Sequence, residues 1–272
     1  MKTKVLIAFL FFASFARAQV SPEVFPTDLE PLPINVLNWQ TPAPLAQNDL
    51  PNIVLIGYWP PTNEMVRRFD HRQRDLWEGE NWEGRGYNIY AFFSEFGPDT
   101  PQGVGAFQVD YQATSNDFWN IVPLYSPVAV LSFGRSSANK DWEIEMVTRN
   151  LTYWNPDFVP PLRPEVAPPD ESFARDGERL TEFPGDAIVE ALRSEVPALN
   201  AFTDRNGAGA YLCEYLGFHL SWYRELNPDR VRFAAHTHIG SNSNLETLSR
   251  GMDTMLRVLC REIILMQIDR LN

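Results

Sequence analysis

Short apolar runs alternate with helix-like segments along most of this chain, and this alternation restricts the possible folds more than any other feature. Buried strands are expected at Ile53–Tyr58, Pro127–Gly134 and Val231–Ala235, where apolar residues dominate. Helices are expected at Gly185–Ser194 and Asn244–Leu271. Strands that alternate with helices build parallel sheets covered on both faces. The sequence therefore predicts an α/β fold, a single-domain α/β/α sandwich around a largely parallel twisted sheet.

The remaining predicted elements complete this pattern. Tyr87–Phe93 and Ala106–Tyr111 have the composition of strands, and Ser115–Val122 that of a capped helix. Asn200–Asp204 is predicted to be a strand that leads into a glycine-rich turn, and the C-terminal helix is predicted to break at Gly251.

The N-terminus has the layout of a secretory signal. In Met1–Ala18, Lys2 and Lys4 precede the apolar run Val5–Phe12, and small residues stand at the end of the segment. The apolar run is too short to span a bilayer, which disfavours a membrane anchor. We expect cleavage near Ala18 and export to the periplasm or the extracellular space.

The proline-rich segment 19–50 is expected to form an extended arm, and residues 51–272 to form the α/β domain. With 272 residues, 44% of them hydrophobic, the chain can bury a large core. Loss of Lys2, Lys4 and Arg17 with the signal changes the formal charge from −12 to −15. Such an acidic protein is not expected to bind nucleic acid or an anionic membrane.

Cys213 follows the small residues of Asn206–Ala210 and opens an apolar, helix-like run. A thiol at that place would lie beside unpaired backbone N–H groups and the positive end of a helix dipole, which favour a thiolate. His236 ends a predicted strand and could supply a base. The alternative is that Cys213 and His236 are ordinary core residues.

Two further alternatives remain open for these residues. A disulfide between Cys213 and Cys260 would suit an exported protein, but Cys260 lies in an amphipathic helical run where a buried thiol is expected. His236 and His238 share one strand face and could be half of a metal site. Because no third and fourth ligand is evident, we expect no metal and no cofactor.

The cysteine segment Gly207–Tyr215 (GAGAYLCEY) resembles the motif of the pyroglutamyl peptidase I family, in which a small-Ala-Gly-small-Tyr-aliphatic-Cys-Asn run carries the nucleophile. Phe233–His236 is similar to the family's Gly-Phe-Ile-His motif, at an interval of 236 − 213 = 23 residues. In Glu143–Asn150, three residues match the family's catalytic Glu-Arg-Val-Ala-Ile-Asn run in spacing, namely Glu145, Val147 and Asn150.

Two more segments resemble the family in the same order along the chain. Asn52–Asn63 is similar to its first strand and its Gly-Phe-x-Pro-Phe-Gly-Gly loop, and Phe183–Val189 to a Leu-Pro helix start. The resemblance implies a cysteine peptidase or amidase that removes an N-terminal pyroglutamyl or similar small cyclic acyl group. It also implies peptide or small amide substrates and the capacity to form a homo-oligomer.

The resemblance implies a role for each site residue. Cys213 would be the nucleophile, His236 the base and Glu145 the group that orients the imidazole, although Glu143 and Asp141 compete with Glu145. Tyr58 and Trp59 would hold the flat acyl ring. Where the family has an arginine ten residues after the glutamate, this chain has Asn155, and Arg135 or Arg163 could substitute.

A second departure concerns the residue after the cysteine, which is Glu214 in place of the family's asparagine. A carboxylate beside a thiol disfavours the thiolate. These departures support an alternative function, a secreted binding protein that keeps the fold without turnover. A metal-dependent hydrolase that uses His236 and His238 is the third hypothesis.

Overall fold

The structure, a computed structural model, describes residues 46, 48–136, 141–164 and 176–269. The predicted signal segment 1–18 and nearly all of the predicted arm 19–50 lie outside the described residues. The described strands of the main sheet are, in chain order, β1 (Asn52–Gly57), β2 (Asn88–Gly97), β3 (Thr100–Gly105), β4 (Ala129–Ser136), β5 (Asp141–Glu145), β8 (Asn200–Asp204) and β9 (Phe233–Gly240). β6 (Val147–Arg149) and β7 (Glu178–Leu180) form a separate two-stranded sheet.

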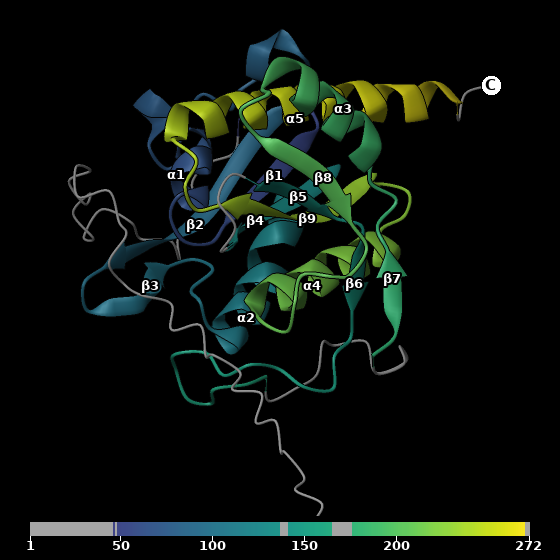
Figure 1. Cartoon of the computed structure of the whole chain (residues 1–272). Coiled ribbons are helices and arrows are strands. Elements are labelled where there is room, and N and C mark those ends of the chain that lie inside the picture. The colour runs from purple at the N-terminus through teal and green to yellow at the C-terminus, as the bar shows by residue number, and fades with distance from the viewer. Residues whose placement is uncertain (1–45, 47, 137–140, 165–175, 270–272) are drawn as a thin grey trace, which may run out of the picture. The chain divides into compact units, whose positions relative to one another are not determined.

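The main sheet has the strand order β3-β2-β1-β4-β9-β5-β8 (Figure 1). β1 pairs in parallel with β2 and β4, β4 with β9, and β5 with β8. Only β3 against β2 and β5 against β9 run antiparallel among these described pairs. The predicted α/β fold around a largely parallel sheet is therefore confirmed.

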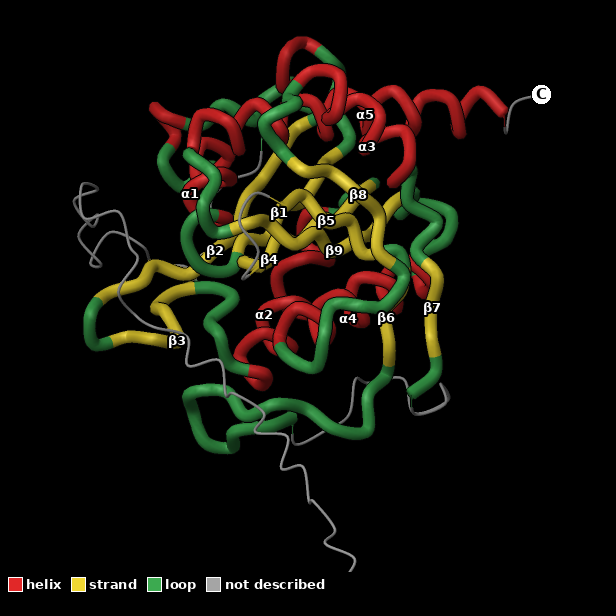
Figure 2. The backbone as a smooth tube through the Cα atoms, viewed as in Figure 1, coloured by secondary structure: helices red, strands yellow, loops and turns green. Residues whose placement is uncertain are grey.

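Helices cover both faces of the sheet (Figure 2). One layer contains α1 (Thr62–Val66), α3 (Gly185–Glu195) and α5 (Leu245–Asp269), and the other α2 (Tyr111–Ile121) and α4 (Leu212–Leu226). Four 3-10 turns lie at η2 (Arg67–Phe69), η3 (Arg74–Leu76), η4 (Trp82–Gly84) and η5 (Val122–Tyr125). None of the helices among the described residues combines the length and the apolar character needed to cross a membrane.

Alternating strand residues feed two hydrophobic clusters, one on each face of the sheet. Ile53 and Leu55 of β1 pack in the cluster that includes α1, α3 and α5. Val54 and Ile56 of the same strand pack in the cluster that includes α2 and α4. Both faces of the strand are fully buried, which explains its continuous apolar sequence.

The predicted strand at Ala106–Tyr111 is wrong. The strand of this region, β3, ends at Gly105. Phe107 has a left-handed backbone, with a φ of +56°, and so does not have the extended conformation of a strand residue. Asp110 accepts a hydrogen bond from the backbone N–H of Ala113 (2.6 Å) and so caps α2, which begins at Tyr111. The helix therefore starts four residues earlier than Ser115.

The predicted break at Gly251 is also wrong, because α5 is continuous from Leu245 to Asp269. The glycine has a packing role. A Cβ at this position would lie 2.7 Å from Cζ3 of Trp142 and 2.8 Å from Cδ1 of Leu199. Gly251 thus allows the helix to approach Trp142, which is fully buried.

Candidate active site

Cys213 is the second residue of α4, directly after a turn with two left-handed glycines, Gly207 (φ +78°) and Gly209 (φ +88°). The N-cap residue Tyr211 makes no side-chain cap hydrogen bond. The thiol is therefore beside the first N–H groups of a fifteen-residue helix, at the positive end of its dipole. Cys213 and Cys260 are both free cysteines, so the disulfide alternative does not describe this structure.

β9 extends beyond the strand predicted from the sequence, because it pairs with β4 as far as Ser136 and Gly240. His236 consequently lies inside the sheet and is fully buried, and His238 follows it on the same face. This face is the one that α4 covers, since Ala234 packs in the cluster with α4.

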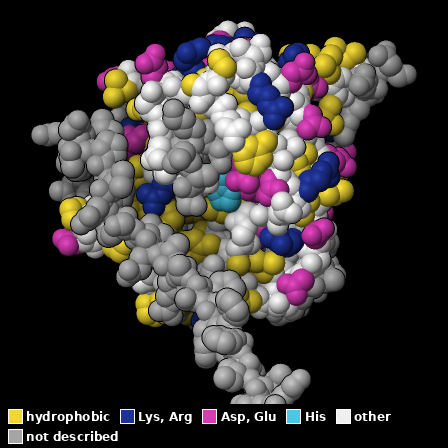
Figure 3. Space-filling view, viewed as in Figure 1, with side chains coloured by type: hydrophobic (Ala, Val, Ile, Leu, Met, Phe, Trp, Pro, Cys, Tyr) yellow, Lys and Arg dark blue, Asp and Glu magenta, His cyan; other side chains and the backbone are white. Residues whose placement is uncertain are grey.

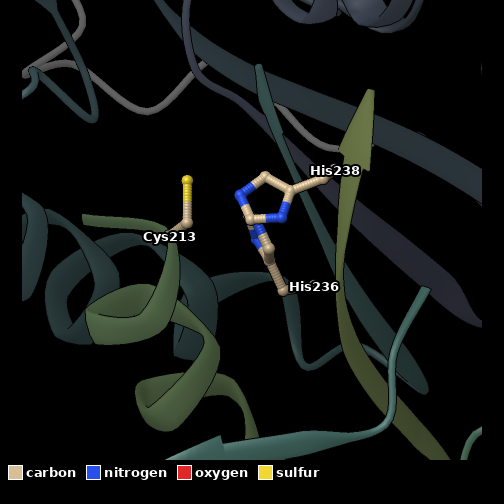
Figure 4. A group of neighbouring side chains, drawn as sticks. All are labelled: Cys213, His236 and His238. Carbon is tan, nitrogen blue, oxygen red and sulfur yellow. The ribbon is translucent and has the colours of Figure 1, made fainter. Parts of the chain in front are cut away.

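His238 is the histidine that contacts both other catalytic candidates. Its Nδ1 lies 2.7 Å from Oε1 of Glu145, and its side chain is hydrogen-bonded to that of Cys213. Figure 4 shows the ring of His238 facing the thiol, with His236 nearer the start of β9. His238 is half-buried, whereas the other three histidines are at most 2% exposed. Figure 3 shows histidine atoms at the surface next to Asp or Glu side chains.

The charge state of His238 follows from these contacts. Burial lowers its pKa, but the Cys213 thiol group and the Glu145 carboxylate raise it by more, to about 11. At neutral pH the ring is therefore an imidazolium, which is the partner that a thiolate needs.

His236 has different partners from those predicted. Its Nδ1 shares a hydrogen bond with Oγ of Ser132 (2.7 Å), the residue opposite it on β4. Burial, followed by the charge of His238, holds its pKa well below the usual value, so the ring is neutral. The structure thus pairs Glu145 with His238, and the predicted contact between Glu145 and His236 is not among the described hydrogen bonds.

The carboxyl group of Glu214 lies against Gly207, in the turn that precedes α4. Its fully buried carboxylate accepts hydrogen bonds from the backbone N–H of Arg149 and from the Arg149 guanidinium (3.3 Å). Burial raises its pKa to about 7, against the opposing effect of these bonds. A Cβ at Gly207 would lie within 2.7 Å of both side chains, so only glycine fits there. Arg149 is a site residue that the sequence analysis missed.

The two aromatic residues predicted to bind substrate point in different directions. Tyr58 is 2% exposed, and its hydroxyl group is hydrogen-bonded to Thr114, so its ring belongs to the core. Trp59 is half-buried and stacks on Tyr211, with ring centroids 6.4 Å apart and planes at 23°. The guanidinium of Arg135 lies over the Trp59 ring at 5.1 Å.

Two more aromatic rings surround Trp59. Phe96 lies 6.2 Å and Phe158 6.1 Å from it between centroids. We call this group the Trp59 cluster; it consists of Trp59, Phe96, Arg135, Phe158 and Tyr211. Burial lowers the pKa of Arg135, which nevertheless stays a cation at neutral pH. Because Tyr211 is two residues before Cys213, the cluster adjoins the thiol.

No family model and no curated protein sequence matches the chain. Solved structures do match. Pyrrolidone carboxyl peptidase from Fervidobacterium islandicum AW-1 is 16% identical, with a TM-score of 0.58 over 77% of this chain and 98% of that one. Pyroglutamyl peptidase I from Bacillus amyloliquefaciens is also 16% identical, with a TM-score of 0.56 over 76% of this chain and 93% of that one. Pyrrolidone carboxyl peptidase from Pyrococcus furiosus is 13% identical, with a TM-score of 0.59 over 78% of this chain and 99% of that one.

The chain has the fold of these peptidases. The likeness spans nearly the whole length of each peptidase, and it includes the mostly parallel sheet with helices on both faces. At 12–16% identity it establishes the architecture and leaves activity to be argued from the site itself.

Proposed function

We propose that this protein is a cysteine-type peptidase or amidase that releases an N-terminal pyroglutamyl or similar small cyclic acyl group. The observation that carries the proposal is the hydrogen-bonded series from Cys213 through His238 to Glu145. The substrate class is supported by the fold, which is shared with pyroglutamyl peptidases. His238, rather than His236, takes the role of the base in this proposal.

In the proposed reaction, the Cys213 thiolate attacks the carbonyl carbon of the amide, and the His238 imidazolium gives its proton to the leaving amine. His238 then removes a proton from the water that hydrolyses the thioester, and Cys213 leaves as a thiolate. Glu145 keeps the ring in position through Nδ1 and stabilises its positive charge.

The oxyanion of the tetrahedral intermediate would be held at the start of α4. The side chain of the N-cap residue Tyr211 accepts no hydrogen bond from the backbone N–H groups of the first turn. These N–H groups can therefore bind a substrate oxygen beside Cys213. The helix dipole favours negative charge at the same place.

The Trp59 cluster is the proposed binding site for the acyl ring. Trp59 has a φ of +58°, a left-handed conformation that costs a bulky residue ~1–2 kcal/mol. Such strain is concentrated at functional sites, where the conformation serves to present a side chain. Arg135 can donate hydrogen bonds to the ring carbonyl of the substrate. Tyr58 supports the cluster from the core.

The proposal is tested with a fluorogenic pyroglutamyl amide. Turnover by the wild-type protein and its loss in Cys213→Ser are expected, while Cys260→Ser, which removes the buried second thiol, is the matched control. Thiol alkylation of Cys213 without turnover would point to a different acyl group. If Cys213 is not alkylated and the amide is not cleaved, the alternative is favoured, namely a binding protein that keeps the peptidase fold.

We propose further that the protein is exported after cleavage near Ala18, on the basis of the signal-like layout of residues 1–18. Expression of the full chain in a bacterial host tests this. Mature protein that begins at Gln19 in the periplasm or medium is expected, and full-length protein retained in the cytoplasm would contradict it.

A further inference from the structure

Cys213, His236 and His238 bring a sulfur and two imidazole nitrogens together at the end of the sheet. One ligand atom from each residue lies within 4.8 Å of the other two. Figure 4 shows that the thiol enters from α4 and that both rings come from β9. His236 takes no part in the proposed peptidase reaction, so its presence here calls for a separate explanation.

The nitrogen that His236 offers is Nε2. Its Nδ1 is engaged with Ser132, and when the Nδ1 proton is donated to that hydroxyl oxygen, Nε2 keeps a lone pair. Nε2 is buried and has no hydrogen-bond partner among the described residues. An unpaired polar atom of this kind costs about 1–3 kcal/mol, which a ligand would recover.

Gly134 of β4 leaves the space between this nitrogen and the thiol. A Cβ at Gly134 would lie 2.5 Å from Sγ of Cys213 and 3.0 Å from Nε2 of His236. Both atoms therefore border the same small volume above the glycine, which any other residue would fill.

His238 completes the set through its second nitrogen. Nδ1 is hydrogen-bonded to Glu145, which leaves Nε2 for the thiol side of the ring. Histidines that bind metals nearly always have the other ring nitrogen bonded to a carboxylate or another oxygen. Both histidines meet this condition, His238 through Glu145 and His236 through Ser132.

We propose that Sγ of Cys213, Nε2 of His236 and Nε2 of His238 form a binding site for a transition-metal ion of the zinc class. One thiolate and two imidazoles suit Zn²⁺ or Co²⁺, with the fourth tetrahedral position open to water. Bond lengths of about 2.3 Å to sulfur and about 2.0–2.1 Å to nitrogen require the ligand atoms to approach to roughly 3.3–3.7 Å.

Metal binding forms three bonds and displaces the proton that Cys213 and His238 share, which passes to solvent without any change of oxidation state. The sulfur lone pair is then used by the metal. The consequence for activity rests on the proposed function: metal and acyl substrate would compete for Cys213, so the ion would be a reversible inhibitor. The site itself does not depend on that function.

Binding is tested with Co²⁺ added to the metal-free full chain. We expect one Co²⁺ per chain, with the visible absorption of a tetrahedral ion and a sulfur-to-cobalt charge-transfer band. Cys213→Ser should lose the charge-transfer band, and His236→Phe should raise the Kd roughly tenfold or more. Cys260→Ser, the matched thiol control, should bind as the wild type does. Co²⁺ binding that is unchanged in folded His236→Phe would overturn the proposal.

X-ray absorption of the Zn²⁺-loaded wild type gives a readout that needs no variant. One sulfur at about 2.3 Å and two imidazole nitrogens at about 2.0–2.1 Å are expected, and a shell without sulfur would also overturn the site. If the protein cleaves the amide but does not bind Co²⁺, the proposed metal site is contradicted and the proposed peptidase function is supported. Co²⁺ binding with the expected bands in a chain that never cleaves the fluorogenic amide supports the site and removes the peptidase.

Discussion

Nδ1 of His238 lies 2.7 Å from Oε1 of Glu145 but 3.7 Å from Oε2 of Glu143, although both glutamates are on β5. Only the shorter separation is within hydrogen-bonding distance. The exposed side-chain fraction is 1% for Glu145 and 21% for Glu143, so the carboxylate that is hydrogen-bonded to His238 is also the one better shielded from water.

This difference predicts unequal effects of two matched substitutions. Glu145→Gln should lower kcat for the pyroglutamyl amide by roughly 10²–10⁴, because the imidazolium loses its counter-charge while the side-chain shape is kept. Glu143→Gln should change kcat by less than about threefold. Steady-state kinetics of the two variants make the comparison, and equal losses would show that Glu143 shares the role that the sequence assigns to Glu145.

A second prediction concerns the reactivity of the thiol. The raised pKa of His238 keeps the ring cationic from acid pH to well above neutrality, so a positive charge lies beside the Cys213 thiol group at pH 6. Iodoacetamide labelling of Cys260→Ser, which has one cysteine, measures the reactivity of Cys213 at pH 6. Adding His238→Gln should slow labelling at pH 6 by roughly tenfold or more, because the thiolate loses its cation.

Equal labelling rates with and without His238 at pH 6 would show that the helix dipole alone activates the thiol. The comparison also separates His238 from His236, whose neutral ring supplies no positive charge. Slower labelling without His238 would exclude His236 as the activating cation.

The position of Cys213 could be predicted from the sequence because it depends on local structure. Two glycines form the turn, and the apolar run after them forms the helix, so residues close in sequence determine where the thiol lies. The same is true of Asn200–Asp204, whose predicted bounds agree with β8.

The choice between His236 and His238 depends on how far β9 extends, which is a tertiary property. Its last residues pair with Arg135 and Ser136 of β4, more than a hundred residues away in sequence. The intervals from Cys213 are 23 and 238 − 213 = 25 residues, and both side chains point to one face. Nothing in the local pattern distinguishes them.

The directions of the side chains of Glu214, Tyr58 and Trp59 depend on residues that are distant in sequence. Glu214 was expected to disfavour the thiolate, but Arg149, which is distant in sequence, binds its carboxylate below the turn. The sequence predicts one ring-binding slot made by Tyr58 and Trp59, yet only Trp59, which has a left-handed backbone, lies in the Trp59 cluster. Such side-chain directions are determined by tertiary packing partners, which the local sequence does not identify.

The Trp59 cluster leads to a prediction about substrate binding. Trp59→Ala should raise KM for the pyroglutamyl amide by roughly tenfold, with a smaller effect on kcat, since a ring contact is worth about 0.5–1.5 kcal/mol beyond its area. Trp222→Ala is the matched control. Trp222 of α4 is also half-buried, but its ring packs on Trp119 of α2 and is not part of the Trp59 cluster. An unchanged KM in Trp59→Ala would remove Trp59 from the acyl-binding site.

The last prediction concerns stability, and it follows from the buried carboxyl group of Glu214. Burial raises its pKa from 4.5 to about 7 in the folded protein, so between these pH values the folded chain holds a proton that the unfolded chain has lost. The contribution of Glu214 to the free energy of unfolding should therefore fall as pH rises from 4.5 to 7, by on the order of 1–3 kcal/mol. Glu214→Gln cannot ionise and should lose this dependence, whereas Glu246→Gln, at an exposed position of α5, should retain it. Urea unfolding of the wild type and both variants at pH 5 and pH 8 measures this contribution, because the other titrating groups are common to all three proteins. A Glu214→Gln variant that loses stability relative to the wild type between pH 5 and pH 8 would show that the Arg149 contacts outweigh burial.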